Sequence, residues 1–169
     1  MSEPNLAPPG AGLPGPEAFA VRNLVFPVLK LKLNRTSSLA LFEKSGQAIL
    51  PLIRDLDLTT FTKPVLIKRL PGLEDSSRNW SAEMTLEHIQ VVTAAALFII
   101  KKLEANESLH LPVRTQDVKP NGGLGLDRIR AFETYLQETP KKSPHLSSNP
   151  KQPTPILGLA TSNPSIGSD

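Results

Sequence analysis

The stretch NWSAEMTLEHIQVV, residues 79–92, decides the fold because it opens the most regular apolar pattern in the chain. Ser81 is a favoured N-cap residue, and acidic side chains follow it near the positive end of a helix. At 100° per residue, one broad apolar arc runs from here to residue 103. Its members are Leu86, Ile89, Val92, Thr93, Ala96, Leu97, Ile99, Ile100 and Leu103. The pattern predicts a long helix with one side in a core, and it places Glu87 and Gln90 on the opposite side.

Three other segments have apolar spacing typical of helices. In residues 39–56 the apolar positions follow steps of three and four after possible N-caps at residues 36–38, and Pro51 predicts a kink or a break. Residues 124–138 predict a further helix, and residues 19–33 a shorter leading helix that packs on the rest. The best strand candidate is KPVLIKRL, residues 63–70. The inward positions predicted for the helix over 124–138 are Leu124, Ile129, Phe132 and Leu136. The sequence therefore predicts an all-α helical bundle with three clear helices and a weaker one.

Both ends of the chain differ in composition from its centre. Residues 1–18 are rich in proline and glycine, and residues 140–169 are rich in proline and serine. Neither end has the apolar periodicity that would offset the entropy of ordering a chain. We therefore expect disordered ends at 1–18 and 140–169 around one helical domain over residues 19–139.

Charge and composition exclude several classes of function. Residues 22–69 hold nine basic and three acidic residues, but the basic ones are dispersed, and the chain has one Trp and one Tyr to stack on bases. There is no cysteine, so disulfides, thiolate metal sites and cysteine nucleophiles are excluded. The apolar runs at 24–33 and 91–100 are too short or too charged to span a bilayer. We expect a cytoplasmic protein that binds neither nucleic acid nor a membrane.

His88 is the one histidine within a predicted helix. It falls on the border of the apolar arc, one turn from Met84 and Val92, and so points along the seam with a neighbouring helix. A catalytic zinc ion needs about three protein donors, yet neither neighbour is a donor. The chain's other histidines, His110 and His145, complete no H-x-x-x-H frame. From the residues alone, His88 is either a packed structural histidine or an isolated ligand, and the first is the simpler interpretation.

Two other motifs are weaker candidates for chemistry. PNGGLG, residues 120–125, lacks the Lys-Ser/Thr of a phosphate-binding loop, and its simplest interpretation is a flexible turn before the next helix. Glu74 and Asp75 could act as acid and base, but adjacent carboxylates in such a loop are usually solvated.

The order of these segments is similar to that of a known family. A first helix ends in LIRDLDLTTFTKPV (52–65), a connection follows, and WSAEMTLEHI (80–89) opens a long apolar helix. RLPGLEDSSRNWS (69–81) and DVKPNGGLG (117–125) resemble loops of one bacterial branch of this family. Over residues 36–139 the chain resembles the DinB-like superfamily of bacterial helical bundles.

The resemblance implies a four-helix bundle with a divalent metal ion, zinc or nickel, held by three histidines. Some members are thiol-dependent transferases or isomerases, so the implied function is that of a metal-dependent transferase or hydrolase with metal-bound water or thiolate as nucleophile. By position, His88 would be the first metal ligand, Ser81 the helix cap and Trp80 a packing residue.

The chain departs from the family where the fourth helix belongs. The family has H-x-x-x-H there, whereas residues 139–169 carry no such motif and many prolines. The metal site is then incomplete, and three helices leave an apolar groove that favours a homodimer. The alternative hypotheses are a non-catalytic helical interaction module, or a truncated inactive product with an out-of-register tail.

Overall fold

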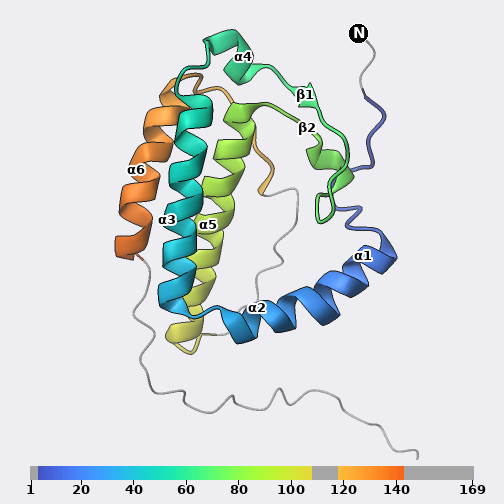
Figure 1. The fold of residues 1–169 in the computed structure, drawn as a ribbon, viewed down its shortest axis with the longest axis vertical. Helices are drawn as coiled ribbons and strands as arrows, with labels where there is room; N and C mark the ends of the chain where they lie inside the picture. The colour runs from blue at the N-terminus through green and yellow to red at the C-terminus, as the bar shows by residue number, and fades with distance from the viewer. Residues whose placement is uncertain (1–3, 108–117, 143–169) are drawn as a thin grey trace, which may run out of the picture.

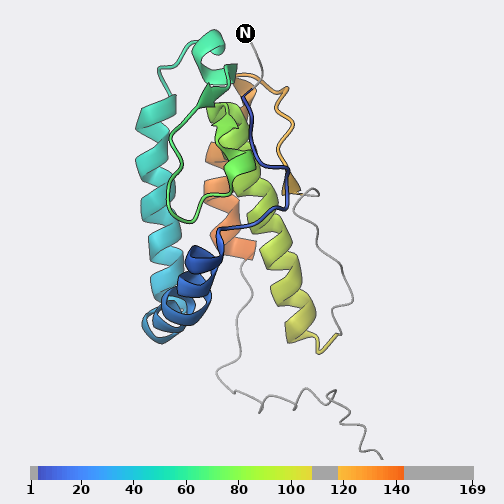
Figure 2. The same ribbon diagram turned by 90° about the vertical axis from the view of Figure 1, so that its right-hand side faces the viewer.

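The computed structural model describes residues 4–107 and 118–142, and these are mostly helical. The longest helices are α3 (Arg35–Ile53), α5 (Ala82–Glu104) and α6 (Asp127–Lys142), which lie side by side in Figures 1 and 2. α6 packs against both α3 and α5. The predicted all-α class is confirmed, while the predicted domain end at residue 139 falls inside α6, which continues through Pro140.

Side-chain caps fix the starts of the two longer helices. The Ser81 hydroxyl accepts from the Met84 N–H at 3.1 Å, as predicted. α3 begins earlier than expected, because Asn34 is its N-cap and forms a reciprocal capping box with Ser37. Pro51 lies inside α3, two residues before its end at Ile53.

The core joins the three long helices to α4 (Leu58–Thr62). Phe61 of α4 is fully buried, and the other buried apolar residues come from α3, α5 and α6; they are Leu50, Ile53, Leu86, Phe132 and Leu136. The inward positions Phe132 and Leu136 are confirmed. Leu124 is not inward, because it precedes α6 and is 49% exposed. The core thus lies toward the α4 end of the bundle, where Figure 1 shows the connections converging.

The connection between α3 and α5 contains a short antiparallel ribbon. β1 (Val65–Leu66) pairs with β2 (Asn79–Trp80), with Val65 opposite Trp80. β1 lies inside the segment KPVLIKRL that was the best strand candidate. A 3₁₀ turn, η2 (Asp75–Ser77), precedes β2. The ribbon places Trp80 immediately before the start of α5.

The N-terminal helical segments form an arm beside the bundle. α1 (Gly15–Ala20), the π-helical turn η1 (Val21–Val25) and α2 (Phe26–Lys32) follow one another, and we call them the N-terminal arm. The prediction that this segment packs on the rest is wrong, since none of the three elements has a buried residue. Figure 1 shows the arm extending sideways from the start of α3, and Figure 2 shows it nearly end-on. The boundary predicted at residue 18 falls inside α1.

The apolar arc of α5 is covered on one side. Leu86 is buried, and Thr93 contacts Tyr135 of α6. The other side of the arc has exposed residues at i, i+4, i+8 and i+11, which we call the α5 stripe: Val92, Ala96, Ile100 and Leu103. Within the described residues, α5 is also the one helix long and apolar enough to cross a bilayer, a property shared by core helices of globular proteins.

Candidate functional site

His88 lies on the first half of α5, and its imidazole ring contacts the Val118 carbonyl and the Trp80 ring. Its Nδ1 is 2.8 Å from the backbone carbonyl oxygen of Val118. A carbonyl oxygen only accepts, so Nδ1 carries the hydrogen and Nε2 carries the free lone pair of the neutral ring. The Trp80 ring is tilted by 57° against the imidazole, with 4.8 Å between the ring centroids. His88 is therefore held on two sides, and Nε2 is its available nitrogen.

A pocket of about 240 Å³ opens beside His88. Its lining comes from the N-terminal segment, the 72–80 connection, α5 and the segment before α6; the residues are Pro9, Gly72, Leu73, Glu74, Ser76, Ser77, Trp80, His88, Val118 and Lys119. The walls thus combine an imidazole, an indole, hydroxyls and an ammonium group. This mixture suits a small polar ligand better than a purely apolar one.

Residues 4–14, which we call the N-terminal strap, are hydrogen-bonded to the 72–80 connection. The Ala7 N–H donates to Asp75 Oδ2 at 2.8 Å. Two strap amides, those of Gly10 and Gly12, donate to Glu74 Oε1 at 2.6 and 3.1 Å. Glu74 and Asp75 therefore hold backbone rather than forming an acid–base pair.

Just beyond the strap, Glu17 accepts from the Gly72 N–H and from Arg69. These bonds lower the pKa of Glu17, with the Gly72 amide as the larger cause. The pKa of Asp75 is also lowered, first by the Arg78 hydrogen bond and then by the Ala7 amide. The strap is thus held by carboxylates in their charged form.

The described residues do not fit a closed metal site. His88 meets one requirement of a ligand, since a ligating imidazole usually donates its other N–H to a carbonyl or carboxylate. However, no group of three or more His, Asp or Glu side chains within residues 4–107 and 118–142 could hold an ion. His110 and His145 lie outside the described residues.

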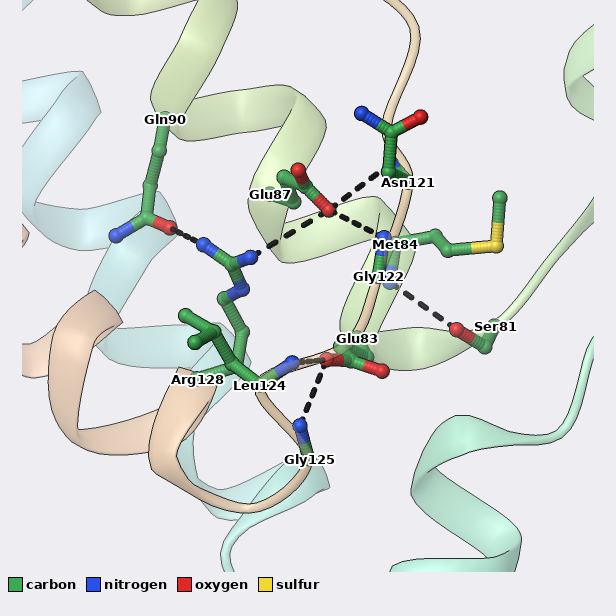
Figure 3. A network of polar contacts seen from close by, with 10 residues as sticks. All are labelled: Ser81, Glu83, Met84, Glu87, Gln90, Asn121, Gly122, Leu124, Gly125 and Arg128. Carbon is green, nitrogen blue, oxygen red and sulfur yellow. Dashed lines mark hydrogen bonds and ion pairs between the residues drawn. The ribbon is translucent and has the colours of Figure 1, made fainter.

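Two glutamates of α5 hold the glycine-rich loop before α6 (Figure 3). Glu83 is 3% exposed, and its Oε1 accepts from the N–H groups of Leu124 and Gly125 at 2.6 and 2.8 Å. Glu87 Oε2 accepts from Gly122 at 2.7 Å and from Asn121 at 3.2 Å. We call these two carboxylates and residues 121–125 the glycine latch. Four of its five amides, those of Asn121, Gly122, Leu124 and Gly125, are bound by the protein's own carboxylates, which argues against a phosphate site in this loop.

Arg128 extends the latch onto α6. One guanidinium nitrogen lies 3.4 Å from Glu87 Oε2, and another donates to Gln90 Oε1 at 3.1 Å. Gln90 in turn donates to the Ala131 carbonyl at 3.1 Å. Glu87 and Gln90, which the sequence places opposite the apolar arc, thus face the start of α6 (Figure 3). The sequence did contain a signal for these contacts. Glu83 and Glu87 lie one turn apart, and the later run of glycines offers closely spaced amides that two carboxylates can bind.

The glycine latch and the histidine site share one segment. Val118, which holds His88, is three residues before Asn121, the first amide bound by Glu87. The orientation of His88 thus depends on a segment that two carboxylates of its own helix fix in place. Comparison with protein-family models, with curated proteins and with solved structures finds no match to this chain.

Proposed function

We propose that this protein is a helical interaction module built as a DinB-like bundle, in which a second copy of the chain occupies the place of the fourth helix. The observation that carries the proposal is the α5 stripe. Val92, Ile100 and Leu103 are 41%, 37% and 57% exposed on a helix whose other side faces the core. Exposed apolar rows of this kind are typical of surfaces that bind another protein.

The α5 stripe is suited to pairing with itself. In an antiparallel pair related by a two-fold axis near Phe98, residue 98+n of one helix lies opposite residue 98−n of the other. Ala96 then faces Ile100, so a small side chain meets a large one, and Val92 lies close to Leu103. The stripe carries no charge between Val92 and Ile100, so such a pair places no like charges together.

The test is the molar mass of the full chain, measured by light scattering during size-exclusion chromatography over a range of concentrations. We expect a dimer that dissociates on dilution. Ile100→Asp should shift it to the monomer, because it puts a carboxylate into an apolar interface. Leu52→Asp is the matched control, since Leu52 is 73% exposed on α3 and lies outside the stripe. A monomer at every concentration, or equal loss in both variants, would contradict the proposal.

A second candidate function is binding of a divalent metal ion, Zn²⁺ or Ni²⁺, in the His88 pocket. The specific observation in its favour is the Val118 contact. It occupies Nδ1 of His88, which lines the pocket, and leaves Nε2 as the nitrogen that could coordinate a metal ion. A metal bound in a complete site of this kind would lower the pKa of a bound water or thiol. With one oriented donor among the described residues, we derive no reaction step from it.

Calorimetric titration of the purified protein with Zn²⁺ and with Ni²⁺ tests this candidate. Stoichiometric uptake that is lost in His88→Ala and kept in a Thr85→Ala control, altered on the same helix, would support it. Uptake that is unchanged in His88→Ala would place the ion elsewhere and remove His88 from the account.

A further inference from the structure

The N-terminal arm exposes large apolar side chains along its length. Leu24, Val28 and Leu31 are spaced i, i+4 and i+7, so they share one side of the helix, and they are 63%, 46% and 87% exposed. Phe19 and Phe26 are 68% and 61% exposed. No residue of α1, η1 or α2 is buried. The bundle therefore does not account for the apolar character of the arm.

The charges of the arm have one dominant sign. Arg22, Lys30 and Lys32 are its basic residues, and no acidic residue occurs between positions 18 and 42. Its single acid, Glu17, is already bound to Arg69 and to the Gly72 amide. The described residues include no ion pair of Arg22, Lys30 or Lys32. The exposed part of the arm is thus apolar and positively charged.

We propose that the N-terminal arm is a peripheral binding site for an anionic lipid surface. A helix that lies in the plane of a membrane buries apolar side chains at the acyl boundary, while Lys and Arg side chains reach back to anionic headgroups. The arm has both features, and it projects to the side of the bundle (Figure 1) with exposed apolar side chains.

This mode of binding differs from spanning a bilayer. The expectation of no membrane partner rested on segments that are too short or too charged to span a bilayer. A helix lying on the surface needs neither that length nor the absence of charge. The positive charges, which oppose spanning, favour adsorption to an anionic leaflet.

The charges also distinguish a lipid surface from the other possible partners of the arm, which are a second copy of the chain and another protein. A second copy would bring Arg22, Lys30 and Lys32 of two arms toward one another, and the positive charges would repel. An acidic protein would satisfy the charges, but it would also need a groove matched to the row of Leu24, Val28 and Leu31. An anionic lipid surface accommodates both.

Co-sedimentation of the full chain with vesicles tests the proposal. We expect binding to vesicles of phosphatidylcholine mixed with phosphatidylglycerol, and much weaker binding to phosphatidylcholine alone. Lys30→Gln and Lys32→Gln should each weaken binding about fivefold. Leu31→Ser should weaken it by about tenfold, because a Leu side chain no longer leaves water.

Matched controls separate the arm from the rest of the surface. Lys44→Gln and Leu52→Ser change an exposed lysine and an exposed leucine on α3 and should leave vesicle binding unchanged. All five variants should keep the molar mass of the parent protein. A loss of vesicle binding is therefore distinguishable from a loss of dimerisation through the α5 stripe. No binding to anionic vesicles would overturn the proposal, as would equal binding to neutral vesicles. Capture by an acidic protein without vesicle binding would assign the arm to a protein partner instead.

Discussion

At the scale of single residues, Glu83 has the most demanding environment in the described chain. It lies in the first turn of α5 and is almost completely buried, and it accepts from two consecutive amides of the glycine latch. A buried carboxylate is stable only when such bonds replace water. The same bonds give partners to two amides in a partly buried loop.

Removing this carboxylate should therefore destabilise the fold. We expect Glu83→Ala to lower the free energy of unfolding by about 2 kcal/mol, because two amides lose a charged acceptor. Urea unfolding followed by circular dichroism measures the change. Glu43→Ala, at an exposed position of α3, should change it by less than about 0.5 kcal/mol. Equal effects of the two substitutions would mean that the latch contributes nothing to stability.

Gly122 is required by the backbone of the same latch. Its φ of +75° is in the left-handed region, and a Cβ there would lie 3.3 Å from Glu83 Oε2. We expect Gly122→Ala to destabilise the protein by about 1 kcal/mol. The change should also appear in the His88 ring resonances by NMR, since Val118 belongs to the same segment. Unchanged His88 resonances would show that the latch and His88 are uncoupled.

Local sequence rules predicted some of these residues and missed others. Ser81 was found because an N-cap depends on the next three residues alone. The border position of His88 followed from the periodicity of α5. The roles of Glu83 and Glu87 could not follow from it, because their partners lie more than thirty residues further along the chain.

At the scale of elements, the contact between α3 and α6 depends on Gly46. This glycine is buried within α3, and a Cβ added to it would lie 2.2 Å from Leu136 Cδ2 and 3.2 Å from Leu136 Cγ. The missing side chain therefore gives Leu136 the space it fills in the core.

In an open helix, replacing Gly by Ala stabilises by about 1 kcal/mol. Here we expect the opposite sign: Gly46→Ala should destabilise by about 1–3 kcal/mol through overpacking against Leu136. Thermal unfolding measures the difference, and Ser45→Ala, at the exposed neighbouring position, should be neutral or slightly stabilising. A stabilised Gly46→Ala protein would show that α6 can move away from α3 without cost.

The three long helices were predictable because each carries a periodic apolar pattern over several turns. The N-terminal arm has apolar residues as well, and this led to the wrong expectation that it packs on the bundle. An apolar residue type shows that burial of the side chain would be favourable, but it does not show whether the protein's own fold or another surface buries it. The half-covered arc of α5 illustrates the same limit, since Leu86 and Val92 look alike in sequence and differ in burial.

At the scale of the whole molecule, the N-terminal strap links the start of the chain to the pocket beside His88. Glu17 and Asp75, which help to hold it, have pKa values below their ordinary values of 4.5 and 3.8. Their stabilising contribution is therefore present above those ordinary values and is lost as the pH falls through the lowered ones.

We expect the strap to loosen in acid as the pH falls below 4.5 and then below 3.8, through the lowered pKa values of Glu17 and Asp75. The chain's single tryptophan, Trp80, lines the pocket beside the strap, so its emission should shift to longer wavelength as the pH falls below these values. A Glu17→Gln, Asp75→Asn protein should show a smaller change over this range, because both carboxylates are absent. An identical titration in the two proteins would contradict the assigned role of these carboxylates.

Two α5 stripes that face each other in antiparallel orientation should be trapped by disulfide cross-linking, and the chain has no cysteine of its own to interfere. Ala96→Cys and Ile100→Cys proteins are mixed, oxidised and compared with Leu52→Cys. We expect a disulfide between the two different variants, with little cross-linking of Leu52→Cys. Cross-linking of each variant mainly to itself would indicate parallel pairing, and equal cross-linking of Leu52→Cys would contradict a specific interface at the stripe.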